Sequence, residues 1–423
     1  GSRNTAIGNR ALNSLNYDGN GYNTAVGFDA GLSVSTGIRN TLIGGLAGDA
    51  LTTGADNVAI GFEALGAEDT GSRNIAMGYQ ALKHANYDGS AYNIAIGYGA
   101  GTAITTGQLN TLIGGLAGYN LSTGHYNVAI GMQALENEDA HGKNVAVGVE
   151  ALQTLNAGTD ALNVAVGYQA GHLMSTGTNN TLIGTFAGTA VTTGVYNVAI
   201  GRNALAAEDA HGYNTAIGTF ALATQNAGTD ALNTAVGYSA GTAVTTGINN
   251  TMIGANAGDS LTTGGYHTAV GYLALSTEDE GGKATAVGWK ALTAQNTNTD
   301  TFNVAVGYQA GSNVTTGAYN VLLGGNAGGG LVNGSYSTAV GYGALGTEDA
   351  GSFNTAMGVN ALALLNAGAD GYNTAIGYTA GAAMTTGVRN TILGGLAGDA
   401  LTTGSNNVAL GYSALSTEDA HGR

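Results

Sequence analysis

The sequence predicts an all-β protein, a parallel β-solenoid or β-roll of about 24 stacked rungs. The first observation is a repeat: "NTAIGYTAG" at Asn373–Gly381 recurs in close variants along the whole chain. The second is its register, because copies begin at Asn4, Asn23, Asn40 and Asn57 and then recur at spacings of 19, 17, 17 and 17 residues, a cycle of 70 that runs six times through 423 residues. The third is a period-2 alternation of apolar residues within each copy, which is typical of a strand.

We number the positions of each rung from its Asn, which is slot 1. In all 24 rungs slot 2 is β-branched, slot 4 is Ile, Val, Leu or Met, slot 5 is Gly and slot 8 is Ala. Slots 2 and 4 predict a short strand that ends in a bend at the Gly, and we expect them to form a core layer of Thr, Val and Ile. A second short strand is expected near slots 8 to 12, closed by "TTG" or a longer turn. A helix is disfavoured, because a Gly every eight or so residues would cost about 1 kcal/mol each.

The third rung of each set of four differs from the others. Its slot 3 is large where most rungs have Ala, and its slot 6 is small where many rungs have Tyr or Phe. The large residues are Leu42, Leu112, Leu182, Met252, Leu322 and Ile392, and the small ones are Gly45, Gly115, Thr185, Ala255, Gly325 and Gly395. Slot 9 follows a second rule, with Leu in first and fourth rungs and Gly in second and third rungs.

Such volume compensation is typical of packed surroundings. Since slot 3 lies on the opposite strand face from slots 2 and 4, we expect it to be buried against an identical chain. The alternative is that Ala at slot 3 is simply small enough to be tolerated at a surface.

The composition narrows the class of protein. The chain has 74 Gly, no Pro, no Cys, only 9% charged residues and a formal net charge of −16. Without Cys there is no disulfide framework and no thiolate metal site. The acidity argues against nucleic-acid binding, and no run of about 18 apolar residues predicts a membrane span. No leader sequence is recognised at the N-terminus.

"NTAVGYQAG"-type units joined by "TTGxxN" resemble the repeats of phage and bacterial tail-fibre-like proteins. They are also similar to the "VAIG" rungs of YadA-type trimeric adhesin heads, which are left-handed parallel β-rolls. The resemblance covers the whole chain and implies a homotrimeric extracellular or virion fibre whose partners are identical chains. The rungs here are longer than those of the adhesin heads, and the 19-17-17-17 cycle is particular to this sequence.

The functional hypothesis is therefore a structural protein, the rigid shaft of a fibre that spaces or presents a binding tip. Residues 1–423 are expected to be one continuous repeat domain of six 70-residue sets. The chain opens and closes at the same seam without atypical capping repeats, which suggests a section of a longer fibre. The expected location is extracellular, on a cell surface or in a virion. A cell-surface glycan or receptor is a further expected partner, bound through a tip that this sequence does not show.

Acidic pairs recur once per set and are the candidates for lateral binding of cations or basic partners. They occupy slots where neighbouring rungs carry an aliphatic residue followed by Ser or Thr. A solvated turn that keeps fibres from clumping is the competing interpretation. The pairs are Glu68 and Asp69, Glu138 and Asp139, Glu208 and Asp209, Glu278 and Asp279, Glu348 and Asp349, and Glu418 and Asp419.

Three further residue sets have less specific signals, and no cofactor is expected. Single Asp residues in first-rung turns lack the remaining ligands of a Ca²⁺ loop, so ordinary turns are preferred; they are Asp18, Asp88, Asp160, Asp230, Asp300 and Asp370. A Glu-Asp-His cluster with a transition metal is conceivable at "EDAHG", which contains His141, His211 and His421, although other sets lack the His. A row of slot 6 Tyr has a possible use in glycan stacking, with core or interface packing preferred; it comprises Tyr79, Tyr98, Tyr168, Tyr238, Tyr308 and Tyr378, and Trp289 fills an equivalent place.

Catalysis is not expected, because an active site needs unlike residues that converge in one pocket and a regular repeat offers none. The alternative functions are a laterally binding adhesin for glycan, a surface or ice, and, ranked last, a glycan-cleaving tailspike. Ice binding requires outward Thr, yet slot 2 is Val or Ile in 10 of the 24 rungs. A tailspike requires paired carboxylates about 5 to 10 Å apart that face a groove.

Overall fold

The computed structural model describes residues 2–417 and 419 and divides into two compact units, Gly1–Gly212 and Tyr213–Arg423. Each unit is a parallel β-solenoid with one short strand per rung, and the described residues contain no helix. The predicted fold class, an all-β parallel solenoid of about 24 rungs, is confirmed. No helix long and apolar enough to cross a membrane occurs in the described part of the chain.

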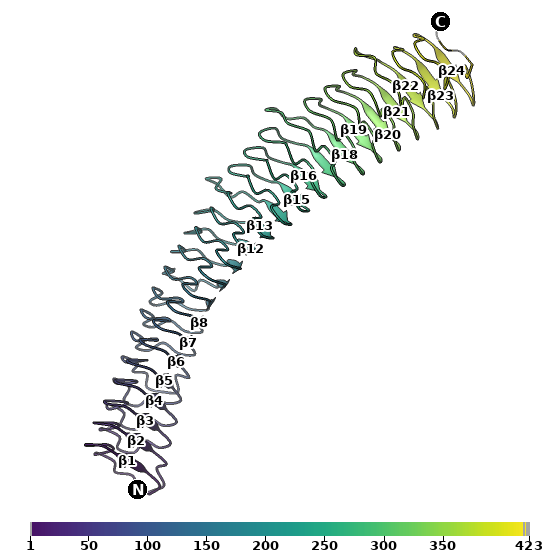
Figure 1. Ribbon diagram of the computed structural model, residues 1–423. Helices are drawn as coiled ribbons and strands as arrows, with labels where there is room; N and C mark the ends of the chain where they lie inside the picture. The colour runs from purple at the N-terminus through teal and green to yellow at the C-terminus, as the bar shows by residue number, and fades with distance from the viewer. Residues whose placement is uncertain (1, 418, 420–423) are drawn as a thin grey trace. The chain divides into compact units, whose positions relative to one another are not determined.

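All 24 strands are three residues long and occupy slots 2 to 4 of their rungs. The first unit contains β1 (Thr5–Ile7), β2 (Thr24–Val26), β3 (Thr41–Ile43), β4 (Val58–Ile60), β5 (Ile75–Met77), β6 (Ile94–Ile96), β7 (Thr111–Ile113), β8 (Val128–Ile130), β9 (Val145–Val147), β10 (Val164–Val166), β11 (Thr181–Ile183) and β12 (Val198–Ile200). The second unit contains β13 (Thr215–Ile217), β14 (Thr234–Val236), β15 (Thr251–Ile253), β16 (Thr268–Val270), β17 (Thr285–Val287), β18 (Val304–Val306), β19 (Val321–Leu323), β20 (Thr338–Val340), β21 (Thr355–Met357), β22 (Thr374–Ile376), β23 (Thr391–Leu393) and β24 (Val408–Leu410). Figure 1 labels most of these strands.

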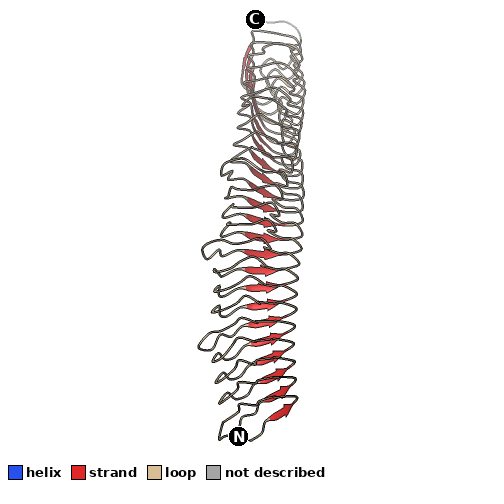
Figure 2. Ribbon diagram, turned by 90° about the vertical axis from the view of Figure 1, so that its left-hand side faces the viewer, coloured by secondary structure: helices blue, strands red, loops and turns tan. Residues whose placement is uncertain are grey.

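Within each unit, consecutive strands pair in parallel with identical slots opposite each other. β2 and β3 align Thr24 with Thr41, Ala25 with Leu42, and Val26 with Ile43. In Figure 2 the strands of the N-terminal unit form a row along one side of the coils. Because the register is the same at every step, each slot forms a column of equivalent side chains.

The interior lies on the slot 3 side of the strands, which corrects the predicted core. Ala25, Leu42 and Ala59 are fully buried, and the flanking slots 2 and 4 are half-buried or exposed on the outside. The buried Ala of slot 8 and the Leu of slot 9 close the interior from the opposite wall of the coil. The expectation that slot 3 packs on a second chain is therefore wrong, because the chain buries this slot within its own coil.

The large residue at slot 3 is compensated by small residues at slot 9, and not by the small residue at slot 6. A Cβ on Gly31 would lie 2.6 Å from Cδ1 of Leu42, and one on Gly48 would lie 2.9 Å from Cδ2 of the same side chain. Slot 6 points outward, where Tyr98 is 62% exposed. The large slot 3 residue of each third rung thus fills the space left by two slot 9 glycines, and both sequence rules describe one interior packing cycle.

The second strand that the sequence predicts near slots 8 to 12 does not form. Slots 6 to 11 make turns instead, and non-glycine residues at slots 7 and 9 adopt left-handed backbone conformations, as at Asp29 (φ 56°) and Leu12 (φ 52°). A left-handed residue turns the chain and cannot continue an extended strand. These turns still hydrogen-bond from rung to rung, as from the amide of Leu12 to the carbonyl of Ala30 at 3.1 Å.

Slot 5 is Gly because two rungs approach each other there. A Cβ on Gly61 would lie 2.4 Å from the carbonyl oxygen of Gly78 in the next rung, and its φ is +132°. Neither the space nor the backbone angle suits any other residue. The column of slot 5 glycines therefore sets the close stacking of the rungs.

Slot 1 Asn residues form a buried hydrogen-bonded column. Asn57 Nδ2 donates to the carbonyl of Gly71 at 2.8 Å, and its Oδ1 accepts the amide N–H of Asn74 at 2.9 Å. In one rung His267 stands at slot 1 in place of Asn. It bonds Gly281 O through Nε2 at 2.6 Å and accepts the Ala284 amide at Nδ1, so an imidazole performs both tasks. Each such side chain ties a turn to its own strand and its strand to the next.

Candidate functional site at the acidic turns

The glutamates of the acidic pairs point into the solenoid. They occupy slot 12, where Val34 and Leu51 are fully buried in second and third rungs. Among the described residues, Glu68, Glu138, Glu208, Glu278 and Glu348 are all 0% exposed. A solvated turn is therefore the wrong interpretation for the glutamate of each pair. Glu418 lies outside the described residues.

Each buried carboxylate accepts main-chain N–H groups that the four-rung cycle leaves without a partner. In second rungs the amide of slot 15, such as Gly37, donates to a carbonyl of the following rung, Thr52 O, at 3.2 Å. Each fourth rung is followed by a rung of 19 residues. In the fourth rung the amide of slot 15, here Gly71, donates instead to the glutamate of its own rung, Glu68 Oε1, at 2.6 Å. Glu68 Oε2 accepts the amide of Tyr87, in the longer turn itself, at 3.4 Å. The glutamate thus joins a 17-residue rung to a 19-residue one.

Similar contacts recur at two other turns, whereas Oε2 of Glu208 and of Glu348 has no hydrogen-bond partner. Glu138 accepts the amides of His141 at 3.2 Å and Ala157 at 3.4 Å. Glu278 accepts those of Gly281 at 3.0 Å and Thr297 at 3.2 Å. Recurrence of the contacts with the sequence cycle explains why one acid stands at this slot in every set.

The aspartates of the pairs have a different position. Their carbonyl groups accept amides from the preceding rung, as Asp69 does from Thr52 at 2.7 Å and Thr53 at 3.3 Å. Their side chains lie at the surface, where Asp139 is exposed. In each described pair the glutamate is therefore internal, and the aspartate has more solvated surroundings.

Burial raises the pKa of four of the buried glutamates, because the charged form loses its hydration. The pKa of Glu68 rises to about 7 from 4.5, although the amides of Gly71 and Tyr87 oppose the change by stabilising the carboxylate. Burial likewise raises the pKa of Glu138, Glu208 and Glu348. These side chains therefore exchange protons with solvent closer to neutral pH than ordinary surface glutamates do.

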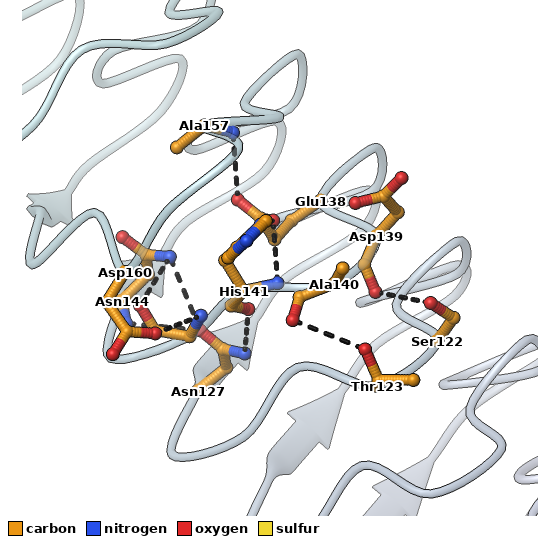
Figure 3. Close-up of polar contacts among 11 residues, drawn as sticks. Ser122, Thr123, Asn127, Glu138, Asp139, Ala140, His141, Asn144, Ala157 and Asp160 are labelled. Atoms are coloured by element: carbon orange, nitrogen blue, oxygen red, sulfur yellow. Dashed lines mark hydrogen bonds and ion pairs between the residues drawn. The ribbon is translucent and has the colours of Figure 1, made fainter.

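In two turns a histidine joins the acidic pair. Ligand atoms of Glu138, Asp139 and His141 lie within 4.8 Å of one another, and those of Glu208, Asp209 and His211 do so as well. Figure 3 shows the first of these turns, with the carboxylate of Glu138 beside the imidazole of His141. In the other described turns the His position is taken by Gly71, Gly281 and Gly351. His421 lies outside the described residues.

The single Asp residues of the first-rung turns are not gathered into such groups within the described residues. Asp160 pairs with Lys143 at 2.7 Å, Asp300 pairs with Lys283 at 2.6 Å, and Asp88 accepts Thr70 Oγ1 at 2.9 Å. Each therefore bonds to the preceding rung. These contacts agree with the preference for ordinary turns.

The slot 6 Tyr side chains lie on the outer strand face and are not part of the core. Tyr79 is 43% exposed and stacks on Tyr98 with ring centroids 5.2 Å apart and planes inclined by 7°. Trp289 stacks on Tyr308 at 4.8 Å in the same manner. These four rings contact each other face to face, whereas Tyr168 and Tyr238 contact Phe186 and Phe220 edge-on.

A longer column of stacked aromatic side chains was not predicted from the sequence. It occupies the residue before slot 1 and consists of five exposed rings with centroids 4.9 to 5.3 Å apart: Phe302, Tyr319, Tyr336, Phe353 and Tyr372. The signal that could have revealed it is aromatic residues at the 17- and 19-residue spacing immediately before the Asn.

No protein-family model matches this chain, and no curated protein matches it either.

Proposed function

We propose that this chain is a structural protein, the shaft of an extracellular or virion fibre in which three identical chains pack together and hold a binding tip at a distance. The observation that carries the proposal is the outward strand face. Slots 2 and 4 carry no charged residue in any rung, and the side chains that they place outside are Thr, Val, Ile, Leu and Met. The same uncharged face of Thr and apolar side chains recurs in the described rungs of each unit, and such a face favours a protein partner.

Charge supports the choice of an identical chain as that partner. The net charge of −16 makes copies of the chain repel each other, except along a face that lacks charge. A surface that repeats from rung to rung is complementary to a surface with the same repeat, which a second copy provides. The number three comes from the resemblance to trimeric adhesin heads and tail-fibre repeats.

Sedimentation equilibrium and small-angle scattering of the full chain test this proposal. We expect a mass of three chains and an elongated particle. A matched pair of variants places the same added charge on two sides: Ile113→Lys and Ile130→Lys on the outward strand face, and Thr106→Lys and Thr123→Lys at exposed turns. The strand-face variant is expected to dissociate and the turn variant to stay associated. A monomer at all concentrations, or a compact globule, would refute the proposal.

Lateral binding to an ordered surface such as ice is a second candidate, favoured by one observation. The slot 2 side chains face outward, and they are Thr in 14 of 24 rungs. Regularly spaced outward hydroxyls are what such binding requires. A thermal-hysteresis measurement decides the matter, since activity lost on changing outward Thr to Lys would favour this candidate over the shaft.

A further inference from the structure

Two acidic turns hold unlike metal-ligating side chains close together. The imidazole Nδ1 of His141 lies 3.8 Å from Glu138 Oε1, and that of His211 lies 3.7 Å from Glu208 Oε1. These distances exceed hydrogen-bonding distance. Two ligand atoms at about 2.1 Å from one tetrahedral zinc ion lie about 3.4 Å apart, so a small side-chain movement brings either pair to that separation.

Polar atoms at both turns have no partner. The Nδ1 atoms of His141 and His211 are shielded from solvent and form no hydrogen bond. Oε2 of the fully buried Glu208 also lacks a hydrogen-bond partner, as does Oε2 of Glu348 in a turn that has Gly in place of His. Buried polar atoms of this kind cost free energy unless a ligand satisfies them.

The electrostatics of the turn favour a cation. Glu138 is fully buried and forms an ion pair with His141. The nearby ammonium group of Lys143 pairs with Asp160 at 2.7 Å instead. A buried carboxylate is stable when it is paired or coordinates a metal, and the exposed Asp139 adds a second carboxylate beside it.

We propose that Glu138, Asp139 and His141 bind a divalent transition-metal ion, with Zn²⁺ as the preferred ion, and that Glu208, Asp209 and His211 form a second site of the same kind. Imidazole nitrogen and carboxylate oxygen are both zinc ligands, and three protein ligands leave a fourth position for water. The nitrogen ligand favours Zn²⁺ over Ca²⁺ and Mg²⁺, which take oxygen. The proposal is independent of the fibre function.

The chain supplies its own control for folding. At the position of His141, other sets carry Gly71, Gly281 and Gly351 in turns with the same glutamate contact. His141→Gly and His211→Gly therefore introduce a residue that this turn already accommodates. His84 and His125 are exposed and belong to neither cluster, so His84→Ala with His125→Ala is the matched variant that removes two other imidazoles.

Isothermal titration of the full chain with Zn²⁺ alone tests the proposal. We expect the H141G/H211G variant to bind two equivalents of Zn²⁺ fewer than the wild type, and the H84A/H125A variant to bind as the wild type does. Ca²⁺ and Mg²⁺ at the same concentrations are expected to give no comparable binding. Unchanged Zn²⁺ uptake in H141G/H211G, or an equal loss in both variants, would overturn the proposal.

The two aspartates, of which Asp139 is exposed and Asp209 is half-buried, provide a second variant that leaves the glutamates in place. Asp139→Asn with Asp209→Asn is expected to weaken Zn²⁺ binding by about tenfold or more, since a neutral amide replaces a charged ligand. Zn²⁺ is also expected to raise the midpoint of thermal unfolding of the wild type and not that of H141G/H211G. An affinity or a midpoint shift that these substitutions do not alter would count against the two sites.

Discussion

At the scale of single residues, the acidic turns give two neighbouring carboxylates different surroundings. Glu68 is fully buried and bonds two main-chain amides, whereas the side chain of Asp69 lies at the surface. The sequence marks both as acids in a turn and does not tell which is internal. The difference follows from slot 12, whose other occupants in the same column are mostly buried and apolar, with Gln225 and Gln295 as the polar exceptions.

This burial predicts a pH dependence of stability. The pKa of Glu68 rises from 4.5 to about 7 on folding, so its stabilising contribution is fully present below pH 4.5 and is lost as the pH rises through about 7. The effect is on the order of 3 kcal/mol, from about 1.4 kcal/mol per pKa unit. We expect the thermal midpoint to decrease from about pH 5 to about pH 8 in the wild type, and to decrease less in Glu68→Gln.

Asp69→Asn is the control for that measurement, because it removes the neighbouring half-buried carboxylate and keeps Glu68, so its profile should stay nearly as steep as that of the wild type. Part of the wild-type slope should persist in Glu68→Gln, since burial also raises the pKa of Glu138, Glu208 and Glu348. A Glu68→Gln profile as steep as the wild-type one would contradict the assignment.

The Asn column gives a second prediction at this scale. Asn57→Ala removes the donor to Gly71 O and the acceptor of the Asn74 amide. Two buried main-chain groups lose their partner, at about 1–3 kcal/mol each. We expect chemical denaturation to show a loss of that order, and Asn57→His to recover part of it, because His267 performs both tasks at the same slot. Equal losses for Ala and His would refute the paired role.

At the scale of elements, each rung is one three-residue strand and a turn that closes the coil. The sequence predicts the strand, because the alternation at slots 2 to 4 is a local signal. It does not predict the turn, where Leu12 and Asp29 adopt left-handed conformations that are rare for such residues. Hydrogen bonds to the next rung hold these residues in place, and no local sequence signal contains that information.

Interior packing between rungs is testable by a double-mutant cycle. Leu42→Ala should destabilise the protein by about 2–5 kcal/mol through the cavity it leaves. Gly48→Ala should also destabilise it, because the new Cβ would lie 2.8 Å from Leu51 Cδ1 and 2.9 Å from Leu42 Cδ2. The double variant should lose less than the sum of the two, since Leu42→Ala frees space for the new methyl group.

Denaturant titration of the four proteins measures the coupling. Gly31→Ala with Leu42→Ala provides a parallel cycle, because a Cβ on Gly31 meets the same Leu42 side chain at 2.6 Å. Additive effects in both cycles would show that slots 3 and 9 do not share the space that the structure assigns to them.

At the scale of the whole molecule, the same strand register in successive sets of the described residues predicts tolerance to the removal of a set. Deleting residues 74–143 joins Arg73 to Asn144. Glu68 is then followed by another 19-residue rung, the one that contains Ala157. We expect this shortened chain to keep the circular-dichroism spectrum per residue and a cooperative thermal transition. Loss of either would argue against modular stacking.

Deletion of a single 17-residue rung is the informative contrast. Removing residues 57–73 keeps the strand register but takes away Glu68 and places the third rung directly before a 19-residue rung. The amides of Thr52 and Thr53 then lose their acceptor, the carbonyl of Asp69. We expect a lower thermal midpoint than for the 70-residue deletion, although fewer residues are removed.

By itself, the sequence determined that this protein is a stack of parallel rungs, that identical slots of consecutive rungs lie in register, and that four rungs form one cycle. Repetition suffices for these conclusions, because identical segments stack best in register. Only the tertiary structure decided which strand face is inside and why a large third-rung residue at slot 3 accompanies Gly at slot 9. It also decided that the described glutamates of the acidic pairs are buried, two of them beside a histidine. Alternation distinguishes two faces without orienting them, and the orientation depends on left-handed turns that close the coil through contacts between rungs.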